Sequence, residues 1–140
     1  MTNIVILGGG IGGIPMAFEM QSMLKPGEKI TVVSNSDSFQ FVPSNPWVAV
    51  NWRSRENICI DLPPIMKDKG IDFTAVGAKR LHPDKNEIEL GDGTTLSYDY
   101  LVIATGPQLA FDEVEGLGPA AHTHSVCHVD HAVSANEAYQ

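Results

Sequence analysis

A glycine run near the amino terminus has the spacing of a phosphate-binding turn. It reads Gly8-Gly9-Gly10-Ile11-Gly12-Gly13 and contains the pattern Gly-x-Gly-x-x-Gly. The first glycine of this pattern permits a tight turn, the second lets the backbone approach a pyrophosphate, and the third lets a helix pack closely on a strand. A dinucleotide site is therefore predicted here, and a glycine-rich turn without a ligand is the alternative. The predicted contacts are Gly8, Gly10, Ile11, Gly12 and Gly13.

The glycine run lies between a predicted strand and a predicted helix, as a dinucleotide site requires. Apolar residues fill Asn3–Leu7, a helix is predicted over Ile11–Leu24, and a second apolar strand over Lys29–Val33. Free N–H groups at the start of such a helix favour phosphate. Strand, turn, helix and strand form a βαβ unit, so the predicted fold class is α/β and Rossmann-like, a parallel sheet with helices.

Ser34 and Asn35 stand where the second strand ends. A carboxylate usually occupies this place and accepts hydrogen bonds from the ribose hydroxyl groups of NAD. Serine and asparagine can also hydrogen-bond a ribose, although without the negative charge. Both residues are therefore predicted to contact the cofactor, and the missing carboxylate weakens a prediction of NAD.

Residues 71–107 contain a second pattern that bears on the cofactor, a series of short predicted strands followed by an apolar strand. Short strands with a period of two are predicted over Ile71–Val76, Lys79–His82, Glu87–Leu90 and Thr94–Ser97, as an antiparallel meander. The buried strand Tyr100–Ala104 comes next. An apolar strand that ends in Ala-Thr-Gly recurs in flavoproteins similar to disulfide reductases, which favours FAD over NAD. The cofactor contacts predicted in this region are Gly77, Ala78, Ala104, Thr105, Gly106 and Pro107.

Aromatic residues and prolines are concentrated between Ser34 and Asn57. This segment is long for a loop and too apolar for a disordered one, so we expect it to pack on another part of the protein. Two interpretations remain open. The segment covers a sheet edge, or it forms one wall of a flavin pocket, in which case Val42 and Pro43 contact the cofactor.

Cys127 lies in the run Ser125-Val126-Cys127-His128-Val129-Asp130-His131, just before a helix predicted over Asp130–Tyr139. Neighbouring histidines and a helix N-terminus favour a thiolate, which is a nucleophile. A second interpretation is an inert thiol. A third is a zinc site built from this cysteine and the nearby histidines. The spacing of these residues matches no closed zinc pattern, so no metal is predicted. Cys59, between two isoleucines, is expected in the core.

Composition narrows the classes of function. The chain has 140 residues, of which 43% are hydrophobic, and a formal net charge of −8. An acidic chain of this kind is a poor match for nucleic acid, so no nucleic-acid partner is predicted. No apolar run reaches the length of a membrane-spanning helix, and no signal peptide is visible. The chain stops soon after its last predicted helix begins, which suggests the N-terminal part of a longer protein.

Four stretches together resemble the sulfide:quinone oxidoreductase family. They are Ile-Leu-Gly-Gly-Gly-Ile-Gly-Gly at the amino terminus, Phe39–Val50, the tract Ala-Thr-Gly-Pro-Gln-Leu-Ala-Phe-Asp, and Ser-Val-Cys-His-Val-Asp-His-Ala around Cys127. These enzymes also resemble the chain at Ser34, where a serine stands in place of the acid that usually binds the ribose. The resemblance covers nearly the full chain, and the Phe39–Val50 and Cys127 stretches are its most specific parts.

This resemblance implies that residues 1–140 form a truncated FAD-binding domain. A second dinucleotide domain and a C-terminal membrane-binding region would lie beyond it. In such enzymes sulfide attacks a sulfur bridge at cysteine, and the flavin passes two electrons to a quinone. Cys127 matches the cysteine tied to sulfur handling, and His131 matches a histidine implicated in sulfide oxidation or proton transfer. Peripheral membrane attachment is implied too. The 140-residue piece alone is expected to be inactive.

Other interpretations stay open. A type-II NADH:quinone reductase or a flavocytochrome-type sulfide dehydrogenase would share the glycine run and the Ala-Thr-Gly strand. A nucleotide-binding module without enzyme activity is also consistent with the glycine run. We further expect exposed apolar surface at Trp47 and Trp52, and hence association into homo-oligomers.

Overall fold

A computed structural model describes residues 2–140. The chain forms two compact units. The first unit comprises residues 2–39 and 61–106, and the second comprises Gln40–Ile60 and Pro107–Gln140. The chain thus leaves the first unit after residue 39, returns at residue 61, and ends in the second unit. Each unit is described by itself.

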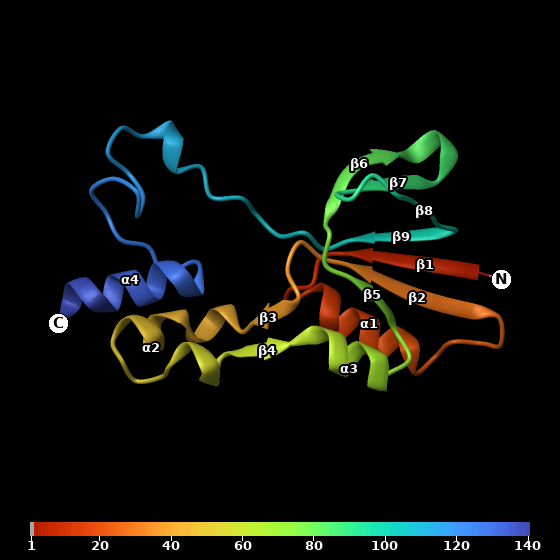
Figure 1. Ribbon diagram of the computed structural model, residues 1–140, viewed down its shortest axis with the longest axis horizontal. Coiled ribbons are helices and arrows are strands. Elements are labelled where there is room, and N and C mark those ends of the chain that lie inside the picture. Colours follow the sequence, from red (N-terminus) through yellow and green to blue (C-terminus); the bar gives the residue numbers. More distant parts are fainter. Residues whose placement is uncertain (1) are drawn as a thin grey trace. The chain divides into compact units, whose positions relative to one another are not determined.

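The first unit is built on a four-stranded parallel sheet in the order β5-β2-β1-β9 (Figure 1). Its strands are β1 (Thr2–Leu7), β2 (Glu28–Val33), β5 (Asp72–Thr74) and β9 (Tyr100–Ile103). In register, Leu7 pairs with Val33 and with Ile103, and Val33 pairs with Thr74. The carboxyl ends of all four strands therefore meet at one edge of the sheet, as in dinucleotide-binding folds.

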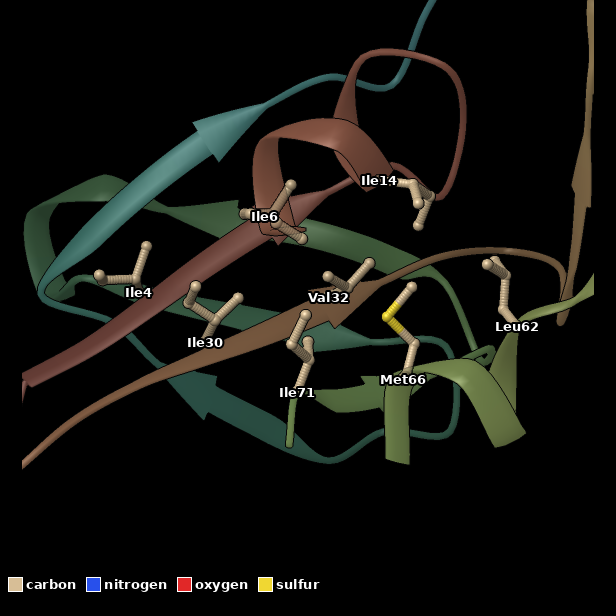
Figure 2. Close-up of a cluster of buried hydrophobic side chains, with 9 residues drawn as sticks. Ile4, Ile6, Ile14, Ile30, Val32, Leu62, Met66 and Ile71 are labelled. Carbon is tan, nitrogen blue, oxygen red and sulfur yellow. The ribbon is translucent and has the colours of Figure 1, made fainter. Parts of the chain in front are cut away.

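One face of this sheet carries the helices α1 (Gly13–Gln21) and α3 (Leu62–Asp68). Alternating residues of the central strands point to that face and are buried with residues from both helices and with Ile71, which precedes β5 (Figure 2). This cluster comprises Ile4, Ile6, Ile14, Ala17, Ile30, Val32, Leu62, Met66 and Ile71. Every second residue of the strands and the inward-facing residues of the two helices together form this core, as the apolar pattern of the sequence predicted.

The opposite face of the sheet is covered by a three-stranded antiparallel meander, β6 (Ala78–His82), β7 (Glu87–Leu90) and β8 (Thr95–Ser97). The other alternating residues of the sheet, Val5, Leu7 and Val33, are buried with Ile88 and Leu90 of the meander. Central strands covered on both faces are apolar without interruption, which is why Ile4–Leu7 shows no polar alternation.

The second unit contains the helices α2 (Asn45–Ala49) and α4 (Val129–Tyr139), with short 3-10 turns at Val42–Ser44, Arg55–Asn57 and Phe111–Glu113. Val48, Ala49 and Ile58 are buried with Val129 and Ala132 of α4. The long aromatic segment therefore does pack, as expected, and its partner within this unit is α4. A two-stranded sheet of β3 (Ser38–Gln40) and β4 (Cys59–Asp61) flanks the segment.

Several predicted boundaries were wrong for identifiable reasons. The strand predicted over Ile71–Val76 is not part of the meander, because its central residues pair in parallel with β2 as β5. The helix predicted over Ile11–Leu24 is shorter at both ends. Ile11 and Gly12 form a turn closed by the Ile14 N–H on the Gly10 carbonyl, and the last turn tightens as Met23 N–H donates to Met20.

The strand predicted as buried over Tyr100–Ala104 ends at Ile103 and is partly exposed. Tyr100 is 65% exposed and Ile103 62% exposed, because β9 lies at the edge of the described sheet. The exposure expected of the tryptophans is confirmed, with Trp47 41% and Trp52 76% exposed. Cys59, expected in the core, is half-buried and packs beside the cluster of α2 and α4.

Candidate functional site

The glycine turn, residues 8–13, is built against the end of β9. An ideal Cβ added to Gly8, whose φ is +116°, would lie 2.2 Å from the carbonyl oxygen of Ala104. The Ala104 N–H donates to the Leu7 carbonyl at 2.7 Å, which carries the β1–β9 pairing one residue past the strands. Only glycine allows this close approach of two backbones. The glycine turn and the Ala-Thr-Gly stretch are thus neighbours in the structure.

Packing also requires the glycine at the start of α1. A Cβ on Gly13 would lie 1.9 Å from the Gly8 carbonyl oxygen, whereas Gly10 has no heavy atom within 4 Å of its Cβ position. Gly13 is buried, while Gly10 is exposed. The three glycines therefore differ in role. Gly8 and Gly13 allow backbone contacts within the protein, and Gly10 leaves an open approach to the turn.

The turn presents unpaired donors to that open side. In the described chain, the backbone N–H groups of Gly9, Gly10 and Ile11 make no hydrogen bond, and Ile11 is 51% exposed. The nine-residue helix α1 follows at once. Its partial positive charge adds to these donors, so an anionic group such as a phosphate is the chemistry that fits here.

Ser34 and Asn35 differ in their availability to a ligand. Ser34 is only 6% exposed, and its hydroxyl accepts the Ser36 N–H at 3.2 Å. A Cβ on Gly9 would lie 2.6 Å from the Ser34 Oγ, so the hydroxyl packs directly under the turn. Asn35 is exposed. Of the two predicted ribose contacts, Asn35 is therefore the side chain with free access, and both contacts stay predictions.

Gly77 joins the same edge of the sheet. Its N–H donates to the Ser34 carbonyl at 2.7 Å, and its Cβ position is 3.6 Å from the Asn35 Cβ. Gly77 has a φ of +74°, which glycine adopts without strain. Ala78 follows as the first residue of β6 and is exposed. Thr105 and Gly106, also exposed, continue from Ala104 beside Gly8.

The remaining predicted residues lie in the second unit. Val42 and Pro43 form an exposed 3-10 turn, and Pro107 is exposed at the point where the chain enters this unit. Beside the turn, Ser44 and Asn45 are fully buried, and Asn45 Oδ1 accepts from the Gln40 side chain at 3.0 Å.

Cys127 lies exposed immediately before α4. Its N–H donates to the Ser125 hydroxyl at 3.2 Å, and the next residue, His128, caps the helix by accepting the Asp130 N–H on Nδ1. Because the thiol has open access and precedes a helix N-terminus, a small nucleophile or electrophile can reach it. This placement agrees with the predicted helix start to within one residue.

His131, in the first turn of α4, lies beside two other rings. Its ring centroid is 5.7 Å from that of His128 and 5.9 Å from that of Phe111. The His131 Nδ1 atom is buried and has no hydrogen-bond partner in the described chain. Cys127 and His131 are thus both held at the start of α4, one before the helix and one inside it.

A residue that sequence reasoning missed completes this region. Arg55 forms an ion pair with Asp130, 75 residues later in the chain. The hydrogen bond to Asp130, with the charge of its carboxylate, raises the pKa of Arg55 above its ordinary value. No local pattern signals such a pair, because its two members meet only when α4 packs on the segment 40–60.

The described residues contain neither a cluster of side chains for a metal ion nor a helix that could span a membrane. Within residues 2–140, no group of three or more histidine, cysteine, aspartate or glutamate side chains is arranged to hold a metal ion. No helix in the described part of the chain has the length and apolar character needed to cross a membrane.

The parallel sheet and the glycine turn at its carboxyl edge define a protein of the Rossmann-like α/β class, a fold that binds dinucleotides in many proteins. The family model of the pyridine nucleotide-disulphide oxidoreductases matches residues 2–139. The chain therefore belongs to that family.

Within this family, the chain is similar to sulfide:quinone oxidoreductases. The chain is 36% identical over 138 residues to a sulfide-quinone reductase of Aquifex aeolicus (strain VF5), which covers 99% of this chain and 31% of that protein. The X-ray structure of the sulfide:quinone oxidoreductase from Aquifex aeolicus matches with a TM-score of 0.90 at 35% identity, covering 100% of this chain and 32% of that one. The resemblance found in the sequence is thereby confirmed.

More distant structures share the fold. A NAD-dependent persulfide reductase from A. fulgidus matches at 25% identity with a TM-score of 0.80, over 99% of this chain and 27% of that one. An NDH2 from Plasmodium falciparum in complex with NADH matches with a TM-score of 0.79, over 96% of this chain and 28% of that one, but its 20% identity shows the fold alone. The chain spans between 25% and 31% of the length of the curated relatives that it matches.

Proposed function

We propose that residues 1–140 are the FAD-binding N-terminal part of a sulfide:quinone oxidoreductase, which oxidises sulfide to sulfur or polysulfide and passes the electrons to a membrane quinone. One observation carries this proposal. The chain is 36% identical to a sulfide-quinone reductase over 138 residues, and that span includes Cys127 as well as the glycine turn. The wider family also extends through the second unit, so the support comes from the level of identity and not from the extent of the match.

The geometry of the first unit fits FAD. The unpaired N–H groups of Gly9, Gly10 and Ile11, with the open space at Gly10, would hold the pyrophosphate. Asn35 would hydrogen-bond the ribose, and Gly77, Thr105 and Gly106 line the same edge of the sheet. Ser34 supports the turn from beneath. Bound FAD supplies the two-electron carrier that sulfide oxidation by a quinone needs.

Cys127 is the residue that we expect to bind sulfur. Its exposed thiol can act as a nucleophile toward sulfur species, and serine or alanine at this position could not. His131 lies in the first turn of the helix that follows, and its buried Nδ1 atom has no hydrogen-bond partner in the described chain. We assign Cys127 and His131 to sulfur binding and proton transfer respectively.

The rest of the longer protein would supply the remaining functions. These are a second dinucleotide domain, further cysteines, the quinone site, and a C-terminal region that attaches the protein peripherally to a membrane surface. The exposed side chains of Trp47 and Trp52 supply apolar surface for contact with those parts or for homo-oligomer formation.

The first test is spectroscopic and uses the full-length protein. Under anaerobic conditions, sulfide at micromolar concentration is expected to bleach the absorbance band of the bound flavin, and a soluble quinone is expected to restore it. The flavin band is recorded after each addition. A flavin that ignores sulfide but is bleached by NADH would assign the protein to the NADH:quinone reductases, and Cys127 would then be an ordinary thiol. Absence of any flavin would overturn the proposal at its first step.

A further inference from the structure

Two segments of the second unit meet at the start of α4. Arg55, in the 3-10 turn Arg55–Asn57, donates from its guanidinium to Asp130 Oδ1. Asp130 Oδ2 lies 3.3 Å from Nδ1 of His128, the residue that caps the helix. One carboxylate therefore contacts both the guanidinium from the earlier segment and the cap that follows Cys127.

The rest of α4 is held by different contacts. Val129 and Ala132 are buried against Val48, Ala49 and Ile58. Farther along, Asn136 Nδ2 donates to the Ala49 carbonyl oxygen at 3.0 Å. These contacts fix the buried side and the middle of the helix. The exposed side of its first turn is contacted by Arg55, the one lysine or arginine side chain that forms an ion pair with α4 in the described chain.

Cys127 has little other support. In the part of the chain that the structure describes, residues 124–127 hydrogen-bond only within their own stretch, through the Cys127 N–H and the Ser125 hydroxyl. The preceding turn is closed by local bonds, among them the Gly118 N–H to Thr123 Oγ1 at 2.7 Å. The position of the thiol is therefore set by the point where α4 begins.

We propose that Arg55 is a positioning residue for Cys127 and His131, acting through Asp130 on the first turn of α4. The relevance to sulfide oxidation rests on the function proposed above; the structural role does not. Without the guanidinium, Asp130 keeps only its neighbour His128 and is free to turn toward solvent, and the first turn of the helix frays. The thiol and the imidazole of His131 then lose their fixed relation, which a reaction between positioned groups requires.

The test compares two arginines of one loop in the full-length protein. Arg55→Met removes the contact with α4. Arg53→Met is the matched control, because Arg53 lies 4.0 Å over the Trp47 ring and donates to the Ser44 hydroxyl, without an ion pair to α4. Amide hydrogen exchange at Asp130 and Ala132, whose N–H groups donate to His128, is expected to rise about threefold in Arg55→Met and to stay unchanged in the control.

Sulfide kinetics supply the second measurement. The rate of flavin reduction by sulfide is expected to fall about tenfold in Arg55→Met, with KM for the quinone unchanged. Arg55→Lys keeps the charge and should recover most of that rate. Asp130→Asn should match Arg55→Met, and the double variant should lose no more than either alone, because both substitutions break one contact.

The outcomes separate the two proposals. Unchanged exchange in Arg55→Met, or losses that add in the double variant, would overturn the positioning role. If the wild-type flavin does not respond to sulfide, the proposed function fails, and the hydrogen-exchange comparison still decides whether Arg55 holds α4.

Discussion

Replacing Cys127 by serine is expected to slow the reduction of the flavin by sulfide about a thousandfold in the full-length protein. A serine hydroxyl is a weak nucleophile at neutral pH and cannot form the sulfur–sulfur bond that a thiol forms. FAD content should stay unchanged, because Cys127 is exposed in the second unit while the glycine turn belongs to the first. Stopped-flow absorbance of the flavin band under anaerobic conditions measures the rate.

Cys59 provides the control for this substitution. It is half-buried in β4 and packs beside the cluster formed by Val48, Ile58 and Val129. Cys59→Ser is expected to keep the sulfide rate within about twofold and to lower the free energy of unfolding by about 1 kcal/mol. A Cys127→Ser protein with full activity would make Cys127 an inert thiol. A variant that had lost its FAD would point instead to a structural role.

The βαβ unit could be predicted from the sequence because its signals are local. The apolar run at Ile4–Leu7, the glycine turn and the second strand are each specified within about ten residues, and all three lie where predicted. The approach of Gly8 to Ala104 was not predicted, because it depends on the pairing of β1 with β9, two strands far apart in the sequence.

The parts that escaped prediction depend on pairing between distant segments. The residues of β5 have the alternating pattern of the meander that follows, and only the tertiary fold decides that they pair with β2 instead. The helix α2 has five residues, too few for a periodic signal, and its packing on α4 has no local trace. Arg55 and Asp130 are ordinary surface charges until that packing places them together.

Ser34 shows how far residue type determines a role. Its position at the end of β2 predicted a ribose contact, yet its hydroxyl lies buried beneath Gly9 and accepts from Ser36. A carboxylate in the same place would be charged and would need a partner or solvent. The neutral hydroxyl is satisfied by the neighbouring backbone. Because residue 34 is a neutral serine and not an acid, it can be buried beneath the glycine turn. The ribose contact is therefore expected mainly from Asn35.

The glycine turn supports the second large prediction, in which two substitutions of the same kind should have different effects. Gly13→Ala is expected to lower the free energy of unfolding by about 3 kcal/mol, because its Cβ would lie 1.9 Å from the Gly8 carbonyl oxygen, a backbone atom that cannot rotate away as a side chain could. Gly10→Ala should change stability by less than about 0.5 kcal/mol, since no heavy atom lies within 4 Å of its Cβ position. Urea unfolding of the FAD-free proteins measures both, because bound cofactor would itself add stability.

FAD titration then separates folding from binding. Gly10→Ala is expected to fold normally and to bind FAD at least about tenfold more weakly, because the added methyl group occupies the open side of the turn where the pyrophosphate must approach the free N–H groups. A Gly10→Ala protein with wild-type affinity would show that no phosphate lies against this turn. A Gly13→Ala protein of normal stability would show that α1 can move away from Gly8. Only the combination of a folded Gly10 variant that fails to bind and a destabilised Gly13 variant supports the separate roles that the structure gives these two glycines.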